Sequence, residues 1–79
     1  MYPMRNVGML VKEARIKKGL TIQQLADWIG ISTTTIQLIE QGKNDKIMFA
    51  ELYELVFKLR IDQTELLRKF LMDRVNYLF

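Results

Sequence analysis

Apolar residues recur every three or four positions from residue 7 to residue 18. On a helix that turns 100° per residue they share one face; they are Val7, Leu10, Val11 and Ala14. Asn6 precedes this run and can cap it, because a short polar side chain accepts hydrogen bonds from free backbone donors. Gly19 follows the run and tolerates the positive φ of a helix end. The pattern predicts a helix over 7–18 after an extended arm over 1–5.

Two shorter amphipathic segments follow and are separated by a tight turn. Thr21 and Gln24 have the spacing of a capping box, so we expect a helix to begin at Ile22. Its apolar positions fall on one side and are Ile22, Leu25, Ala26 and Ile29. Gly30 is expected to end this helix, and Ser32 to cap the next one. The sequence therefore predicts two short helices joined by a turn over 30–32.

The second of these helices has an unusual outward face. Ile36 and Ile39 share its inner face, whereas the opposite arc carries no charge and consists of Thr33, Thr34, Gln37, Leu38 and Gln41. Amides, hydroxyls and methyl groups suit the edges of base pairs in the major groove. The segment 21–41 is therefore predicted to be a helix-turn-helix that reads DNA.

The C-terminal half carries two further helical patterns. After a polar loop over 42–46, apolar groups cover most of the circumference of the segment 48–59, which predicts the central core helix. Asp62 and Glu65 form a possible cap pair for a last helix over 63–79. The apolar arc of that helix spans about 240°, wider than the roughly 100° that one core contact requires. Its second neighbour is expected to be another copy of the chain, and the interface is predicted to comprise Leu67, Phe70, Leu71, Val75 and Leu78.

Composition narrows the possible functions. The 79 residues contain no cysteine and no histidine, which removes the strongest nucleophile and the commonest acid–base group. Their carboxylates form no cluster at the spacing of a metal site. We therefore expect no enzyme, no cofactor and no metal. The net charge of +3 fits a polyanionic partner. No membrane span or signal peptide is recognisable, so no membrane partner and a cytoplasmic location are expected.

These motifs together resemble the lambda-repressor-like, Cro/XRE-type helix-turn-helix family of transcription regulators. The resemblance covers about 7–62 and rests on Arg15, the phrases Gly19-Leu20-Thr21, Leu25-Ala26 and Gly30-Ile31-Ser32, and Ile36 leading to Ile39-Glu40-Gln41-Gly42-Lys43. It implies an all-α, compact bundle of about five helices, a single domain over 1–79, in which the third helix enters the major groove.

The resemblance also implies roles for individual residues. The base-reading positions are Thr33, Thr34, Gln37 and Leu38. The positions that contact the DNA backbone are Thr21, Gln23, Gln41, Lys43 and Asn44. Arg15 and Glu40 match a pair that joins the first helix to the end of the third. Lys43 is the expected phosphate contact, with the basic residues of the first helix as further candidates.

The leading hypothesis is a transcription regulator, expected to be a repressor, that binds a pseudo-palindromic operator in double-stranded DNA as a homodimer. The chain's size is similar to that of phage repressors, restriction-modification controllers and antitoxins, and the sequence does not separate these three. The alternative is a protein-interaction module, an anti-repressor or inhibitor of another regulator, that uses Trp28, Leu38 and the last helix to bind a protein partner. Trp28 is expected either to pack against the first or last helix or to contribute to that surface.

Overall fold

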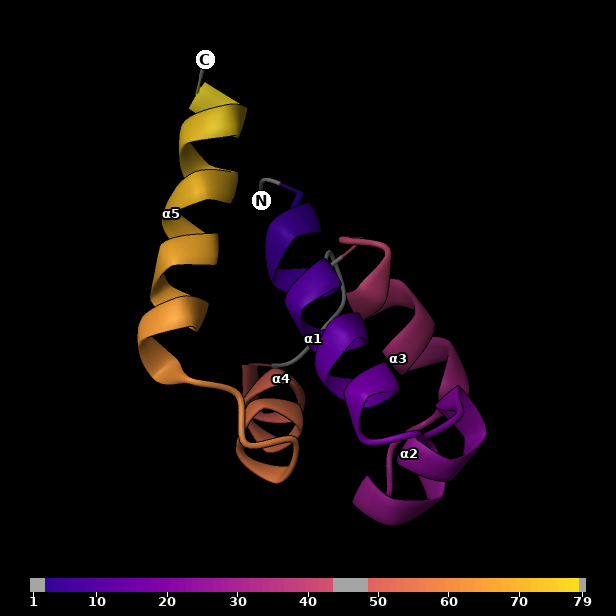
Figure 1. Cartoon of the computed structure of the whole chain (residues 1–79). Helices are drawn as coiled ribbons and strands as arrows, with labels where there is room; N and C mark the ends of the chain where they lie inside the picture. The colour runs from indigo at the N-terminus through magenta and orange to yellow at the C-terminus, as the bar shows by residue number, and fades with distance from the viewer. Residues whose placement is uncertain (1–2, 44–48, 79) are drawn as a thin grey trace.

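The computed structural model describes residues 3–43 and 49–78 (Figure 1). This range forms five α-helices and no strand, which confirms the predicted all-α fold. The helices are α1 (Arg5–Lys17), α2 (Ile22–Ile29), α3 (Thr33–Glu40), α4 (Phe49–Lys58) and α5 (Gln63–Leu78). None of these described helices combines the length and apolarity needed to cross a bilayer.

The predicted signals at the ends of α2 and the start of α3 are all present. Thr21 and Gln24 form a complete capping box, with bonds of 2.9 and 3.0 Å between each backbone N–H and the other side chain. Gly30 ends α2 with a φ of 85°. The Ser32 hydroxyl accepts a hydrogen bond from the Thr35 backbone N–H at 3.1 Å. Each signal acts over at most four residues, so the local sequence determines where these helices begin and end.

The start of α1 differs from the prediction. The helix begins at Arg5, and Asn6 lies inside its first turn, so the expected Asn6 cap was wrong. The cap comes instead from Asp73 in α5, whose Oδ1 accepts from the Asn6 backbone N–H and from Asn6 Nδ2, both at 2.8 Å. Its Oδ2 accepts from the Val7 N–H at 3.0 Å. A carboxylate 67 residues from Asn6 thus satisfies two of the backbone donors in the first turn of α1.

The core lies between α1, α2, α3 and α4. Its largest fully buried side chains are Leu25, Ile36, Leu55, Val7 and Val11. α1 packs along α3 on one side and along α5 on the other (Figure 1). Gly8 makes the close approach to α3 possible, because a Cβ there would overlap the carbonyl oxygens of Ile39 and Glu40. α1 is therefore the helix that joins α3 and α5 in space.

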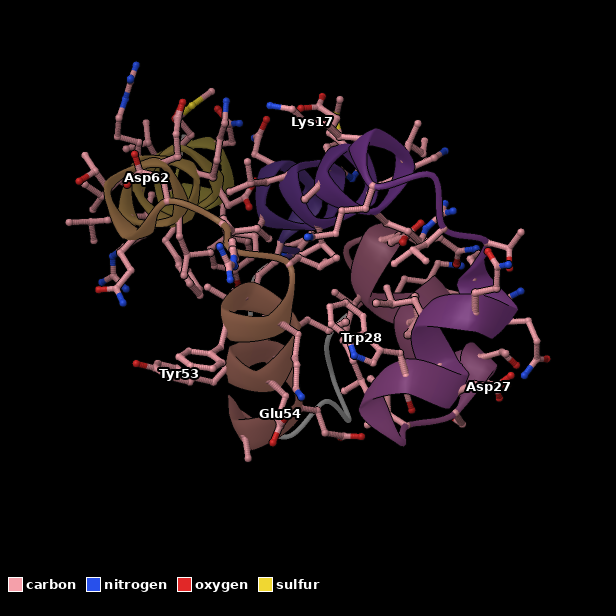
Figure 2. All side chains as sticks on the ribbon, turned by 60° about the horizontal axis from the view of Figure 1, so that its bottom comes forward. Lys17, Asp27, Trp28, Tyr53, Glu54 and Asp62 are labelled. Atoms are coloured by element: carbon pink, nitrogen blue, oxygen red, sulfur yellow. The ribbon has the colours of Figure 1, made fainter. Side chains whose placement is uncertain are left out.

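α4 is buried on one side only, which corrects its prediction as the central core helix. Leu52, Leu55 and Val56 are buried, whereas the side chains of Tyr53 and Phe57 are 58% and 73% exposed. Tyr53 projects away from the rest of the molecule (Figure 2). The sequence pattern shows apolar groups around the helix, but no residue among 3–43 and 49–78 covers this aromatic side.

α5 also has a covered side and an open side. At 100° per residue, Leu66, Phe70 and Asp73 lie on one stripe, and this stripe faces α1. Leu67, Leu71 and Leu78 lie on the next stripe and are between 53% and 59% exposed. At the start of α5, the Asp62 carboxylate accepts from the Thr64 N–H at 2.8 Å. The predicted cap at Asp62 is present, but its partner is Thr64 rather than Glu65.

Candidate nucleic-acid interface

The turn between α2 and α3 sets the direction in which α3 presents its side chains. The N–H groups of Gly30 and Ile31 both donate to the Ala26 carbonyl, at 2.8 and 3.3 Å, so the chain leaves α2 sharply. Ser32 then caps α3. Ile36 and Ile39 are 0% and 4% exposed and fix the inner face of α3 against the core. The opposite face must therefore point to solvent.

That outward face contains the residues predicted to read bases. Thr34, Gln37 and Gln41 are exposed, and Thr33 and Leu38 are half-buried beside them. The face offers amides, hydroxyls and methyl groups without a charge, which is the chemistry of direct readout in the major groove. Thr35, at the border of the face, is held by a 2.8 Å hydrogen bond between its hydroxyl and that of Ser32. The structure thus brings the four predicted base-reading residues onto one accessible surface.

Thr21 and Gln23, the residues predicted to contact the DNA backbone near α2, lie at the start of that helix. Both residues are exposed. The Thr21 hydroxyl already accepts the Gln24 N–H, so it has a donor hydrogen left for another group. Gln23 Nε2 donates to Asp27 Oδ1 at 2.9 Å. A phosphate contact through Gln23 would have to share this amide, and the exposed Asp27 carboxylate would oppose it.

Lys43 stands at the other end of α3. Gly42 turns the chain with a φ of 77°, and the Lys43 N–H donates to the Leu38 carbonyl at 2.8 Å. The Lys43 side chain is exposed, so a cation is available beside the outward face of α3. Asn44, the other residue predicted for this loop, lies outside the described residues.

Arg15 and Glu40 form the predicted ion pair. Arg15 Nε lies 2.7 Å from Glu40 Oε2, a second guanidinium nitrogen donates to Oε1 at 3.1 Å, and the third donates to the Leu20 carbonyl at 2.8 Å. The two side chains are 11% and 6% exposed. This bidentate geometry and the burial of the guanidinium indicate that the pair serves to join α1 to the end of α3.

Trp28 occupies a position between helices rather than in the core. Its side chain is 47% exposed and turns towards α4 (Figure 2). Two ammonium groups lie over the ring, Lys58 Nζ at 5.7 Å and Lys18 Nζ at 6.0 Å from its centre. The cationic side chains cover part of the indole that no helix buries.

Sequence reasoning missed two residues that position the interface, Gly8 and Asp73. Gly8 occurs within a regular helical pattern, and only the close approach of α3 reveals its role. Asp73 lies among the apolar residues of the last helix, and its position there was the one available signal that it faces a polar partner. In the part of the chain that the structure describes, no three acidic side chains gather in a way that would hold a metal ion.

Comparison with known proteins supports the same interpretation. A family model described as "Helix-turn-helix domain" matches residues 8–70, which extend from α1 into α5. No curated protein sequence matches the chain. The family match covers most of the 79 residues and includes the whole α2–turn–α3 unit. The chain therefore belongs to the helix-turn-helix domain family.

Proposed function

We propose that the chain is a sequence-specific DNA-binding transcription regulator of the lambda-repressor-like, Cro/XRE type. It binds a pseudo-palindromic operator as a homodimer and represses by blocking access of the polymerase. The observation that carries the proposal is the outward face of α3, on which exposed Thr34 and Gln37 stand opposite buried Ile36 and Ile39.

The chemistry of that face favours an A·T-rich half-site. An amide such as that of Gln37 pairs with adenine through two hydrogen bonds, and the methyl groups of Thr33 and Leu38 suit the methyl group of thymine. Lys43, Thr21 and Gln41 flank this face and are proposed to hold phosphates. Base discrimination and backbone attachment are thus assigned to different side chains.

The homodimer is proposed to form through the open side of α5. Leu67, Leu71, Val75 and Leu78 are each more than half exposed, and they lie on one side of the helix. Phe70 lies on the stripe that faces α1 and packs partly against the core, so it contributes less to this surface than the sequence predicted. A twofold axis at α5 would present two copies of α3 to successive major grooves, about 34 Å apart.

Selection from random-sequence duplexes tests the proposal. The purified chain is incubated with a duplex library at two salt concentrations, and bound sequences are recovered and read. Enrichment of two A·T-rich half-sites in inverted orientation, with affinity that falls steeply as salt rises, is the expected result. Recovery of no preferred sequence, or of a core made only of G·C pairs under α3, would contradict it.

A second function rests on Trp28. The ring is 47% exposed and lies between α2 and α4 (Figure 2), so it offers an aromatic group at the surface of the molecule. We propose as the alternative that the fold binds another regulator through Trp28, Leu38 and α5. Failure to select any DNA sequence, together with a stoichiometric complex with a regulator encoded beside the chain, would favour this alternative. Loss of that complex in Trp28→Ala would show that Trp28 belongs to the surface that binds the regulator.

A further inference from the structure

Two buried polar connections hold α1 in place, and they lie on opposite sides of it. On one side the guanidinium of Arg15 binds Glu40 at the end of α3. On the other side the carboxylate of Asp73, in α5, caps the first turn of α1 through Asn6 and Val7. α5, α1 and α3 are thus joined in series by directional hydrogen bonds.

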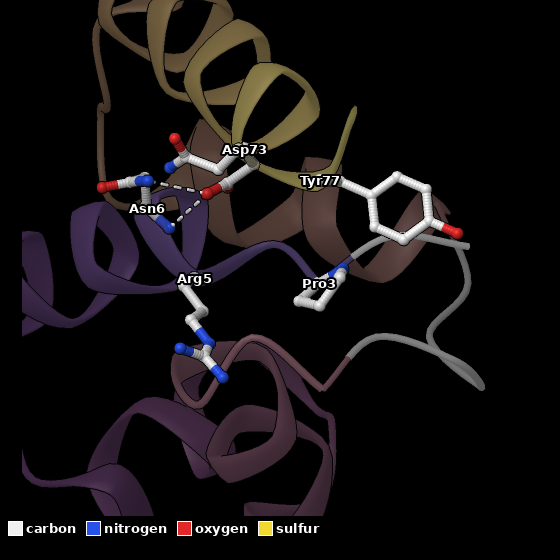
Figure 3. Close-up of a pocket in the computed structure, with 6 residues that line it drawn as sticks. Pro3, Arg5, Asn6, Asp73 and Tyr77 are labelled. Atoms are coloured by element: carbon white, nitrogen blue, oxygen red, sulfur yellow. Dashed lines mark hydrogen bonds between the residues drawn. The ribbon is translucent and has the colours of Figure 1, made fainter. Parts of the chain in front are cut away.

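The carboxylate of the second connection is deeply buried. Asp73 is 3% exposed although it lies in a helix whose other side is open to solvent. Figure 3 shows its carboxylate pointing at the side chain and backbone of Asn6, beside a small cavity lined by Pro3, Arg5, Asn76 and Tyr77. A carboxylate that accepts three N–H groups has little freedom to move, since each bond weakens steeply when its angle changes.

Apolar contacts alone would fix α5 less exactly. Leu66 and Phe70 pack against the core, but both are only half-buried. α1 is the main helix against which α5 packs, and the contacts between α5 and α4 are sparse. Half-buried apolar side chains tolerate sliding and rotation, whereas the Asp73 cap permits one register of α5 along α1.

We propose that Asp73 is a positioning residue that sets the spacing between the two DNA half-sites. The inference rests on the proposed function, because it takes the open side of α5 as the dimer contact. The distance between the two α3 helices of a dimer then depends on the angle between α5 and α3, and Asp73 fixes that angle through α1. Loss of the cap leaves each α3 intact but lets α5 move against it.

The first part of the test needs no DNA. The chain has no cysteine, so spin labels can be placed at Asp27→Cys on α2 and Arg68→Cys on α5, both exposed positions outside the capping box and the Asp73 cap. Labelled protein is diluted with unlabelled chain, and the distance distribution within one chain is measured. A narrow distribution is expected, and Asp73→Ala is expected to broaden it. Asp73→Asn keeps one acceptor oxygen and is expected to give an intermediate width, which provides a result even where Asp73→Ala does not fold.

The second part uses the selected operator with spacers changed one base pair at a time. The wild-type chain is expected to prefer one spacing over others by about tenfold or more, and Asp73→Asn or Asp73→Ala to reduce that preference to about threefold. The affinity of both Asp73 variants for a single half-site is expected to remain within about twofold of the wild-type affinity. Leu52→Ala, which removes core atoms of α4 and leaves the Asp73 hydrogen bonds in place, controls for general loss of stability and should keep the wild-type spacing profile.

The outcomes separate the two proposals. A distance distribution that stays narrow in folded Asp73→Ala or Asp73→Asn overturns the positioning role, whatever the DNA results are. A broadened distribution with an unchanged spacing preference overturns the link to half-site spacing. Where the wild-type chain selects no operator, the proposed function has failed and the spacing role fails with it, while the distance measurement still decides whether Asp73 holds α5.

Discussion

Gln37 is the residue on which sequence discrimination by α3 is expected to depend most. Its side chain is exposed at the middle of the outward face. Gln37→Ala should remove about 1 to 3 kcal/mol of preference for adenine at one position of each half-site. Competition between duplexes that differ at that base pair measures the effect. Lys43→Ala is the matched control. It should weaken binding to all sequences equally and reduce the slope of log affinity against log salt concentration by about 1. If Gln37→Ala lost affinity equally for every duplex, Gln37 would not be a base-reading residue.

Glu40 is expected to matter for stability through the charge that its loss leaves behind. Its partner Arg15 is buried, and the Arg15 guanidinium donates to the Glu40 carboxylate and to the Leu20 carbonyl. Glu40→Ala should therefore lower the free energy of unfolding by about 3 to 5 kcal/mol, as found when one partner of a buried pair is removed. Urea denaturation measures it.

Two further variants test this interpretation of the ion pair. Glu13→Ala removes an exposed carboxylate of α1 and should change the free energy by less than about 0.5 kcal/mol. Replacing both partners by apolar residues, in Arg15→Met with Glu40→Leu, should recover much of the loss. A Glu40→Ala chain as stable as the wild type would show that water compensates the buried guanidinium.

At the scale of single helices, Gly8 controls how closely α1 approaches α3. Alanine at this position gains about 1 kcal/mol of helix propensity. Its Cβ would also lie 2.8 Å from the Glu40 carbonyl oxygen and overlap that of Ile39, and both contacts are with backbone. The two helices must then separate, and overpacking of this kind costs about 1 to 3 kcal/mol.

We therefore expect Gly8→Ala to unfold at a lower temperature than the wild type. Thermal unfolding followed by circular dichroism measures the shift. Met9→Ala changes the next residue of α1, which is 54% exposed, and should leave the melting temperature nearly unchanged. A higher melting temperature for Gly8→Ala would mean that helix propensity outweighs the close approach.

The helices also show which features a sequence reveals. Thr21, Gly30 and Ser32 were predicted correctly because each acts on neighbours three or four residues away. The cap of α1 was not predictable, since Asp73 and Asn6 are 67 residues apart. The periodicity of α4 reveals which positions are apolar but not which of them a neighbour covers, so the prediction of a central core helix was wrong on the side of Tyr53 and Phe57. Roles in DNA contact stay predictions for every residue of α3.

At the scale of the whole molecule, α5 is expected to hold two copies of the chain together. Leu71 is the sharpest place to test this, because it is 53% exposed and its replacement does not disturb the packing of α5 on α1. Leu71→Asp should give a folded monomer that binds the full operator weakly. Sedimentation velocity measures the mass, and circular dichroism measures the fold.

The control for this variant changes an exposed residue of α5 outside the apolar stripe. Asn76→Ala lies on the flank of the helix, adds no charge beside Asp73 and should remain dimeric. A Leu71→Asp chain that still sediments as a dimer would move the interface away from α5. In that case Tyr53 and Phe57 on α4 would form the next surface to test.

The cap that Asp73 gives to α1 has a consequence for synthesis of the chain. A ribosome releases the first turn of α1 long before it adds residue 73, so the N–H groups of Asn6 and Val7 emerge without the carboxylate that satisfies them. A 13-residue helix is marginal in water by itself. The caps of α2 and α3 come from neighbouring residues and emerge together with these helices, whereas the cap of α1 is complete only once residue 73 has left the ribosome.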